Sequence, residues 1–261
     1  MNTTLITGAS SGIGEAFARR LAALGRNVLL VARSEDKLAT LCNELGRINR
    51  IRAQYVVLDL SKPESARLLF EETEKRGLLI DMLINNAGFG SMGDFSTLDL
   101  ERELNMIDLN IKSLVELTYT FLVPMRTRKQ GTIINVASTA SFQAVPFMAT
   151  YAATKAFVLS FSEAVREENR PYGVHVMALC PGVTETNFFE AARGRKPPVR
   201  AAQTAEEVVQ TALNGLNHRK GTVISGWSNF IMVEFERIVP RSLIVRVAGR
   251  MMRSEFEDKH D

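Results

Sequence analysis

The sequence predicts an α/β fold with a single doubly wound parallel sheet of about seven strands and helices on both faces. Its 261 residues contain short, continuous apolar runs that alternate with amphipathic segments of helical periodicity. Continuous apolar runs are typical of strands buried on both faces, and their alternation with helices implies right-handed β-α-β crossovers. Because the chain shows no internal repeat and no linker, we expect one domain over residues 1–261.

The strands are predicted where β-branched and other apolar residues run together. The expected ranges are 3–7, 27–31, 52–58, 80–84, 131–137, 174–179 and 221–226. Most of these runs lack the polar–apolar alternation of a sheet that faces water on one side. We therefore expect helices to cover both faces of the sheet.

Helices are predicted between the strands from apolar spacing and from residues that commonly begin or end a helix. The expected ranges are 12–24, 34–45, 61–75, 99–128 as one or two helices, 150–169 and 204–216. Ser34 and Ser61 are the expected N-caps of the second and third helices, and Gly46 should end the second. Thr204, with Glu207 three residues later, predicts a capping box on the last helix.

Composition argues against several classes of protein. The net charge is only +3, and no basic run with interleaved aromatic residues indicates nucleic-acid binding. Cys42 and Cys180 lie far apart and the three histidines share no ligand spacing, so we expect reduced thiols and no metal site. The sequence has neither a signal-peptide pattern nor a run of about 18 apolar residues, so we expect a cytoplasmic protein.

A glycine-rich loop follows the first predicted strand and opens the first helix. It reads TGASSGIG, residues 7–14. Gly8 allows a sharp turn, while Gly12 and Gly14 let the backbone approach a pyrophosphate at the helix N-terminus. Free N–H groups and the helix dipole favour an anion there, and Ser10 and Ser11 add hydroxyl donors. A turn required only by chain geometry is the alternative interpretation.

The end of the second predicted strand indicates which dinucleotide is preferred. NAD sites usually have an acidic residue here that binds the ribose 2′-hydroxyl, whereas this sequence has Ala32 followed by Arg33. A guanidinium can bind a 2′-phosphate through two hydrogen bonds, which favours NADP(H). NAD(H) is the alternative if Asp36 turns inward, but we place Asp36 inside the next helix.

A tyrosine and a lysine one helical turn apart suggest proton transfer. Tyr151 and Lys155 share one face of the predicted 150–169 helix. At ~5 Å and an effective dielectric of ~20, the ammonium would favour the phenolate by about 3 kcal/mol and lower the phenol pKa by roughly two units. Ser138 follows the 131–137 strand, where its hydroxyl could donate to a substrate carbonyl oxygen or simply cap the local turn.

Together these motifs resemble the short-chain dehydrogenase/reductase family, in its one-domain branch with a Rossmann-like sheet. The resemblance covers residues 1–226. It is carried by TGASSGIG at 7–14, DL at 59–60, INNAG at 84–88, Asn110 in MIDLNIKS, the set Ser138, Tyr151 and Lys155, and PGVTET at 181–186. Locally, TGASSGIGEAFARRLA and LLVARSEDKL are similar to bacterial NADP-dependent reductases of the hydroxysteroid/3-ketoacyl reductase type.

The resemblance implies an oxidoreductase that transfers hydride between a nicotinamide and a carbonyl or secondary alcohol. Tyr151 would exchange the proton, and Lys155 would hold the ribose and lower the phenol pKa. Ser138 would steady the substrate oxygen, and Asn110 would hold a water of a proton relay. The implied cofactor contacts are Gly8, Ser10, Ser11, Gly12, Ile13, Gly14, Arg33, Asp59, Leu60, Asn86, Ala87, Gly88, Tyr151, Lys155, Pro181, Gly182, Val183, Thr184 and Thr186.

The resemblance also implies a homodimer or homotetramer, because members usually pair through long helices. A catalytically silent NADP-binding regulatory protein of the same fold is the alternative function. Such relatives usually lack the tyrosine or the lysine, and this sequence keeps both.

Segments outside the motifs suggest how a substrate is held. Residues 187–203 are longer than a usual connection, which favours a substrate lid. Apolar residues near the motifs favour an apolar substrate; they are Phe89, Met92, Phe142, Val145, Pro146, Phe147, Phe188 and Phe189. Residues 227–261 form an amphipathic C-terminal extension, for which packing on a subunit or on the pocket is favoured over peripheral membrane contact or disorder.

Overall fold

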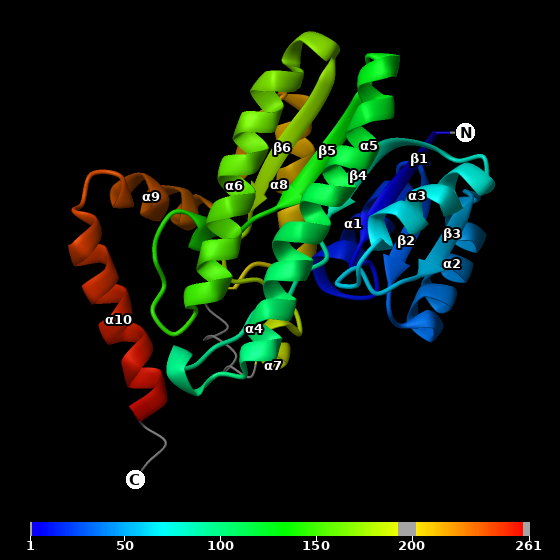
Figure 1. Ribbon diagram of the computed structural model, residues 1–261. Coiled ribbons are helices and arrows are strands. Elements are labelled where there is room, and N and C mark those ends of the chain that lie inside the picture. The colour runs from blue at the N-terminus through cyan, green and yellow to red at the C-terminus, as the bar shows by residue number, and fades with distance from the viewer. Residues whose placement is uncertain (1, 193–201, 258–261) are drawn as a thin grey trace.

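The computed structural model describes residues 2–192 and 202–257, and within them seven parallel strands form one sheet. The strands are β1 (Asn2–Thr7), β2 (Asn27–Ala32), β3 (Ala53–Val57), β4 (Leu79–Asn85), β5 (Gly131–Val136), β6 (Val174–Cys180) and β7 (Thr222–Ile224). Their order across the sheet is β3-β2-β1-β4-β5-β6-β7. The predicted doubly wound parallel sheet is therefore confirmed (Figure 1).

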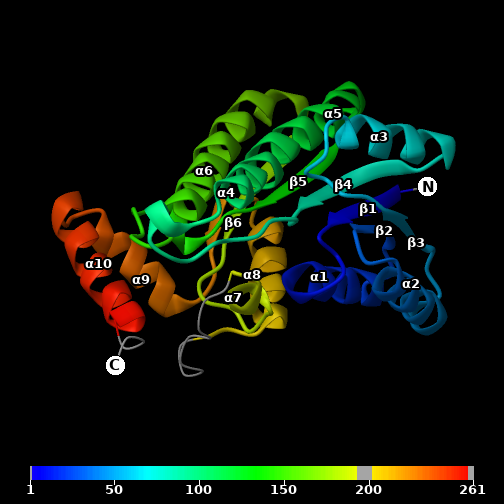
Figure 2. The ribbon, with the colours of Figure 1, turned by 60° about the horizontal axis from the view of Figure 1, so that its bottom comes forward.

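Helices cover both faces of this sheet. They are α1 (Gly12–Ala23), α2 (Glu35–Asn49), α3 (Ser65–Lys75), α4 (Leu100–Ile107), α5 (Leu114–Arg128), α6 (Ala149–Asn169), α7 (Phe188–Ala191), α8 (Ala205–Asn217), α9 (Trp227–Glu236) and α10 (Arg241–Glu257). In Figure 2, α1, α2 and α8 lie on one face, and α3, α5 and α6 lie on the other.

The continuous apolar strands are explained by this two-sided cover. Ile6 and Leu30 belong to the buried cluster under α1, α2 and α8. Their neighbours Leu5 and Leu29 belong to the buried cluster under α3, α5 and α6. Because successive side chains of a strand point to opposite faces, a strand covered on both sides buries consecutive apolar residues.

Two predicted helix boundaries are wrong, for local reasons. The second helix continues past Gly46 to Asn49 and ends at Arg50, which adopts the left-handed conformation. The third helix begins at Ser65 rather than at Ser61. The amide and hydroxyl of Ser61 both donate to the carboxylate of Asp59, at 3.0 and 2.7 Å, and this local turn replaces the first helical turn.

The predicted 99–128 helix forms, but its hydrogen-bond pattern changes in the middle. Between α4 and α5, residues Asp108–Ser113 form a π-helical segment that contains Asn110. Such insertions into α-helices are frequently found at functional sites. Asn110 therefore lies at an irregularity that the sequence pattern did not predict.

The C-terminal part also contains regular structure. The predicted capping box begins α8, since the Glu207 amide donates to Thr204 Oγ1 at 3.2 Å and the Thr204 amide donates to Glu207 Oε2 at 2.9 Å. After β7 the chain forms α9 and α10, and α10 lies at the edge of the molecule in both views (Figures 1 and 2). Across residues 2–192 and 202–257, no helix is both long and apolar enough to cross a bilayer.

The strand order reverses direction between β1 and β4, which are direct neighbours. In open parallel sheets, the carboxyl ends of the strands at such a point form the crevice that binds ligands. The glycine loop follows β1 and the INNAG segment includes the end of β4. The fold therefore brings these two motifs to one place.

Candidate active site

The glycine loop packs directly against the residues that follow β4. Gly8 has φ +64°, and a Cβ there would lie 2.9 Å from both Ala87 Cα and Asn86 Nδ2. A Cβ on Gly14 would lie 2.3 Å from the carbonyl oxygen of Gly8. Asn86 Nδ2 holds the loop by donating to the carbonyl oxygens of Thr7 at 2.9 Å and Gly8 at 3.2 Å. The loop therefore needs glycine for this close packing.

The N-terminus of α1 is available to an anion. Ser11 is the N-cap of α1, and its side chain makes no capping hydrogen bond. Gly12 has φ +57°, and a Cβ there would lie 3.0 Å from Thr186 Cγ2 in the PGVTET segment. Free helix N–H groups beside close-packed glycines fit the phosphates of a dinucleotide.

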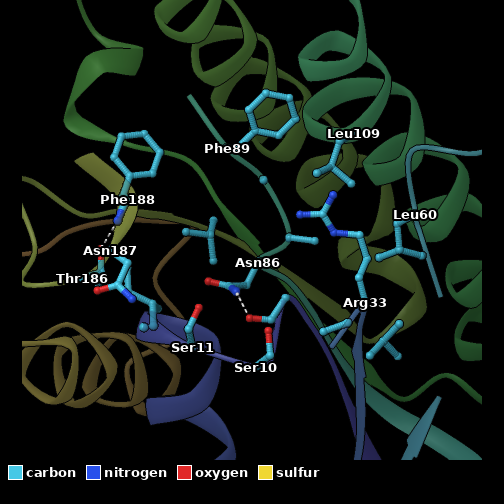
Figure 3. A pocket seen from close by; sticks show the side chains of 18 of the residues that line it. Ser10, Ser11, Arg33, Leu60, Asn86, Phe89, Leu109, Thr186, Asn187 and Phe188 are labelled. Atoms are coloured by element: carbon cyan, nitrogen blue, oxygen red, sulfur yellow. Dashed lines mark hydrogen bonds between the residues drawn. The ribbon is translucent and has the colours of Figure 1, made fainter. Parts of the chain in front are cut away.

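These segments line a pocket of about 360 Å³ at the carboxyl ends of the strands (Figure 3). Its lining is Gly8, Ser10, Ser11, Gly12, Ile13, Val31, Ala32, Arg33, Ser34, Leu58, Asp59, Leu60, Asn86, Ala87, Gly88, Phe89, Leu109, Val136, Ala137, Ser138, Tyr151, Lys155, Pro181, Gly182, Thr186, Asn187 and Phe188. The structure thus brings most of the predicted cofactor contacts together. Gly14, Val183 and Thr184 are the predicted contacts that do not line the pocket.

Tyr151 and Ser138 meet at the end of the pocket beyond β5. The phenol hydroxyl and the Ser138 side chain form a hydrogen bond. Ser138 Oγ also accepts from the Ala140 amide at 3.1 Å, so the serine caps the local turn as well. The capping interpretation of Ser138 is therefore confirmed, and its contact with a substrate carbonyl oxygen stays a prediction.

Burial controls the acidity of the tyrosine and the lysine. It raises the pKa of Tyr151 to about 12, although the hydrogen bond with Ser138 acts in the other direction. It lowers the pKa of Lys155 to about 8, with the Cys180 thiol acting in the other direction. Lys155 Nζ lies 5.8 Å from the centre of the Tyr151 ring and donates to the Val136 carbonyl oxygen at 2.8 Å.

The prediction that Lys155 lowers the tyrosine pKa is therefore wrong for this structure. Removing the phenol from water disfavours its anion more than the partner groups in the chain favour it. At neutral pH Tyr151 is consequently a neutral phenol, which is the form that can donate a proton.

Asn110 lies beside the pocket rather than in its lining, and it is 1% exposed. Its Nδ2 donates to the Phe89 carbonyl oxygen at 3.0 Å and to Thr154 Oγ1 at 3.1 Å, and its Oδ1 accepts from the Phe89 amide at 3.1 Å. The side chain thus ties the loop after β4 to α6. Its role in holding a water stays a prediction.

Arg33 lies on the opposite side of the pocket from Phe188, near Leu60 (Figure 3). Although burial raises the pKa of the nearby Asp59, hydrogen bonds from Ser61 bring it below its usual value. The charges of Arg33 and Lys62 act in the same direction as those hydrogen bonds. Asp36 is the second residue of α2 and does not line this pocket, which agrees with its predicted helical position.

Sequence reasoning missed a buried polar network behind the pocket. Asn85 Nδ2 donates to Asn135 Oδ1 at 2.9 Å and to Thr118 Oγ1 at 3.1 Å. Asn135 Nδ2 donates in turn to Ser162 Oγ at 2.9 Å. The network joins β4, β5, α5 and α6, and so holds the helix that carries Tyr151. The signal for it was an asparagine within each of two otherwise apolar strands.

An apolar cluster of side chains surrounds Tyr151. The ring centres of Phe188 and Tyr151 are 5.1 Å apart. The other members of the cluster are Met106, Met148, Phe89, Met92, Ala140, Val145 and Met252 of α10. Of the predicted apolar lining, Phe142 packs on a different cluster with Val158 and Leu159.

The predicted lid is described only in part. Its first residues form the short helix α7, which begins at Phe188. Residues 193–201 lie outside the described residues. Gln203, at the end of the predicted lid, pairs with Thr184 through an isolated parallel bridge.

Comparison with known proteins agrees with this geometry. The family model for short chain dehydrogenase matches residues 2–197. A putative ketoacyl reductase of monensin polyketide synthase from Streptomyces virginiae is 41% identical over 211 residues, which are 79% of this chain and 79% of the relative. The 7beta-hydroxysteroid dehydrogenase of Mediterraneibacter gnavus is 33% identical over 230 residues, 86% of each chain.

A solved structure shows the same fold at similar identity. The short-chain dehydrogenase from Sphingobium yanoikuyae, in complex with NADPH, is 32% identical, with a TM-score of 0.82 over 86% of this chain and 87% of that chain. The match of the family model extends over most of the chain, and the sheet, glycine loop and tyrosine–lysine helix are all in place. The chain therefore belongs to the short-chain dehydrogenase family and is an oxidoreductase.

Proposed function

We propose that this protein is an NADP-dependent reductase that interconverts a lipophilic ketone and its secondary alcohol. The observation that carries the proposal is one pocket with two ends. At one end are the glycine loop and Arg33, and at the other are Ser138, Tyr151 and Lys155. A dinucleotide and a carbonyl group can therefore be held side by side.

The chain's own residues fit a dinucleotide. The N–H groups at the start of α1, with Ser10 and Ser11, would bind the pyrophosphate, and Lys155 would hold the ribose hydroxyls. When bound, NADP(H) supplies or accepts the hydride at the carbonyl carbon. The exposed Arg33, with no acidic residue in its place, supports a preference for the 2′-phosphate of NADP(H) over NAD(H).

Tyr151 is proposed as the proton donor for reduction. Its hydroxyl is neutral at physiological pH and lies in hydrogen-bond contact with Ser138. A carbonyl oxygen placed between these two hydroxyls would receive a hydrogen bond from each, which stabilises the charge that develops during hydride addition. Lys155, with a pKa lowered to about 8, can pass a proton toward the tyrosine at neutral pH.

The surroundings of the tyrosine support an apolar substrate. Phe89 and Phe188 line this end of the pocket, and Met92, Met148 and Met252 of α10 belong to the same apolar cluster as Tyr151. A ketone with an apolar body would bury its surface here without leaving charged groups unpaired. The names of two relatives, a ketoacyl reductase and a hydroxysteroid dehydrogenase, point to the same substrate class.

The Tyr151→Phe variant tests the reductase against the catalytically silent NADP-binding alternative. It should lower kcat for NADPH-dependent ketone reduction by at least about 100-fold, because a positioned proton donor contributes about 100- to 10,000-fold. NADPH affinity should change less than about threefold. Tyr172→Phe, which removes a half-exposed phenol elsewhere, is the control. Activity that survives in Tyr151→Phe would refute the assignment.

The Arg33→Ala variant tests the cofactor preference. Loss of a charge-assisted contact to the 2′-phosphate should weaken NADPH binding by about 10- to 100-fold and leave NADH binding nearly unchanged. Arg47→Ala, an exposed arginine on α2, is the matched control. Equal affinity of the wild type for the two cofactors would contradict the proposed preference.

Three further assignments accompany this proposal. Residues 187–203 act as a substrate lid on a single domain, and the protein is cytoplasmic.

The chain pairs with a second copy through α4, α5 and α6, where Leu104, Tyr119 and Phe157 are exposed. Leu104→Glu with Phe157→Glu should dissociate the assembly in sedimentation velocity, and a monomeric wild type would rule the pairing out.

A further inference from the structure

The last two helices present apolar side chains outward. Trp227, Ile231, Phe235 and Ile238 follow one another at steps of four, four and three residues, and their exposed fractions lie between 52% and 79%. At about 100° per residue, Trp227, Ile231 and Phe235 lie on one face of α9, and Ile238 follows in the turn after the helix. Leu243 and Val247, 50% and 46% exposed, extend the apolar surface along α10. We call these six residues the outer stripe.

The opposite sides of both helices are attached to the body of the protein. In α9, Val233 is fully buried and Asn229 Nδ2 donates to the Ser225 carbonyl oxygen at 2.6 Å. In α10, Met252 packs on the cluster around Tyr151, and a Cβ on Gly249 would lie 3.4 Å from Pro146 Cγ. The outer stripe is therefore carried by anchored helices rather than by a loose tail.

Arginines flank the outer stripe, and two of them, Arg246 and Arg250, have no ion-pair partner among the described residues. Residues 237–253 contain five arginines and no aspartate or glutamate, and the acidic residues of the C-terminus come only after Ser254. Arg246 and Arg250 each lie three residues after a member of the outer stripe on α10. Neither forms an ion pair with any residue of the described ranges. Arg237 pairs with Glu234 of α9 at 3.1 Å.

We propose that the outer stripe docks this protein on an anionic lipid bilayer, with α9 and α10 lying in the headgroup region. Apolar residues on one side of a helix, with arginines beside them, are typical of interfacial helices, and arginines are attracted to anionic headgroups. Trp227 suits the polar–apolar boundary of a membrane. The helices lie on the bilayer, since none in the described part of the chain can span one.

Charge favours this partner over a second copy of the chain. A two-fold contact through the outer stripe would bring the arginines of the two copies toward each other. Residues 237–253 contain no carboxylate, and of the two on the last turn of α9, Glu234 already pairs with Arg237 and Glu236 has a buried carboxylate oxygen. A bilayer of anionic lipids instead offers many negative headgroups and an apolar layer for the aromatic side chains.

Docking would also bring the active site to the lipid surface. Through Met252, α10 contacts the apolar cluster around Tyr151 and Phe188. A lipophilic ketone could then pass from the bilayer to the pocket along α10 without crossing water. This step rests on the proposed function, whereas docking itself does not.

Trp227 provides a direct assay, because it is the only tryptophan in the chain. The full chain is titrated with vesicles of phosphatidylglycerol and phosphatidylcholine, and with vesicles of phosphatidylcholine alone. We expect the tryptophan emission to shift to shorter wavelength, and the protein to sediment, only with the anionic vesicles. Salt should weaken the binding, because it screens exposed charges.

Matched variants separate the outer stripe from general surface effects. Arg246→Gln with Arg250→Gln should weaken binding about thirty-fold, at about 1 kcal/mol per arginine. Phe235→Ser with Ile238→Ser should also weaken it by at least about tenfold. The controls are Arg47→Gln with Lys75→Gln, and Ile48→Ser, which is 62% exposed on α2; they should bind within about twofold of wild type. Circular dichroism melts check that each variant is folded.

Four outcomes would overturn docking, and the first three are no binding to anionic vesicles, equal loss in the controls, and tighter binding to an acidic acyl carrier protein than to vesicles. A fourth is a smaller assembly in the Phe235→Ser with Ile238→Ser variant, which would make the stripe an interface between copies. The two double variants of the outer stripe and its arginines should still reduce a water-soluble ketone with NADPH. Tyr151→Phe should keep vesicle binding, so failure of either proposal is distinguished from failure of the other.

Discussion

Replacing Lys155 with methionine should abolish activity and yet make the cofactor-free fold more stable at neutral pH. Lys155 is 7% exposed, and burial lowers its pKa from 10.5 to about 8. The folded chain therefore holds the ammonium less favourably than the unfolded chain does. Methionine has a similar shape, fits an apolar site and carries no charge to desolvate.

The expected magnitude follows from the two pKa values of Lys155. Their difference corresponds to about 3 kcal/mol of destabilisation at about pH 7. Loss of the 2.8 Å hydrogen bond from Nζ to the Val136 carbonyl oxygen should cost about 1–2 kcal/mol. We therefore expect Lys155→Met to be more stable than wild type by about 1–2 kcal/mol at that pH.

The pH dependence gives the sign of the effect independently. Because the folded pKa lies below the unfolded pKa, the penalty is fully present below the folded pKa of about 8 and disappears as the pH rises toward 10.5. As the pH rises from about 7 to about 9.5, the free energy of unfolding of wild type should increase by about 2 kcal/mol relative to that of Lys155→Met. The other titratable groups are the same in both proteins, so their contributions cancel when the unfolding free energy of one is subtracted from that of the other.

Urea unfolding at these two pH values measures the prediction. The comparison needs wild type, Lys155→Met and the control Lys75→Met, whose side chain is 81% exposed. The control should show no pH-dependent difference from wild type. A Lys155→Met protein that is less stable than wild type at neutral pH, or a stability difference that does not change with pH, would refute the reasoning.

Three further variants test packing that the structure shows. Gly14→Ala places a Cβ 2.3 Å from a backbone oxygen, so thermal melts should show that the free energy of unfolding falls by about 2–4 kcal/mol. Titrations should show that the dinucleotide affinity falls at least about tenfold. Gly46→Ala is the control that should be tolerated, because its Cβ would make no contact under 3.7 Å. Gly90→Ala would place a Cβ 2.6 Å from Phe188 Cζ, and should change KM for an apolar ketone several-fold more than KM for NADPH; equal changes would count against a substrate contact. Thr204→Ala removes the N-cap of α8 and should cost about 1 kcal/mol in urea unfolding, and an unchanged midpoint would mean that the cap contributes nothing.

The regular elements were largely predictable because their signals are local. Continuous apolar runs identified all seven strands, and the capping box at Thr204 identified the start of α8. The errors arose where two local signals competed. Ser61 could cap a helix or bind the neighbouring Asp59, and the structure uses the second option. The π-helical segment at Asn110 had no pattern of its own.

The candidate site was predictable in its membership but not in its electrostatics. The glycine loop and the Tyr151–Lys155 spacing each identify a motif, and the strand order brings both to one pocket. The direction of the tyrosine pKa was not predictable, because it depends on how deeply the phenol is buried. The apolar cluster around the phenol includes Phe188 and Met252, which come from distant parts of the chain.

By itself, the sequence determined the alternation of strands and helices, the flexible glycines of the phosphate loop and the residue types that can move a proton. These depend on neighbours a few positions apart, so short patterns carry them. Only the tertiary structure decided which groups lose contact with water. It buried Tyr151 and Lys155 and closed the Asn85–Asn135 network, and it left the outer stripe exposed. Desolvation depends on the packing of remote segments, and no short stretch of sequence specifies that packing.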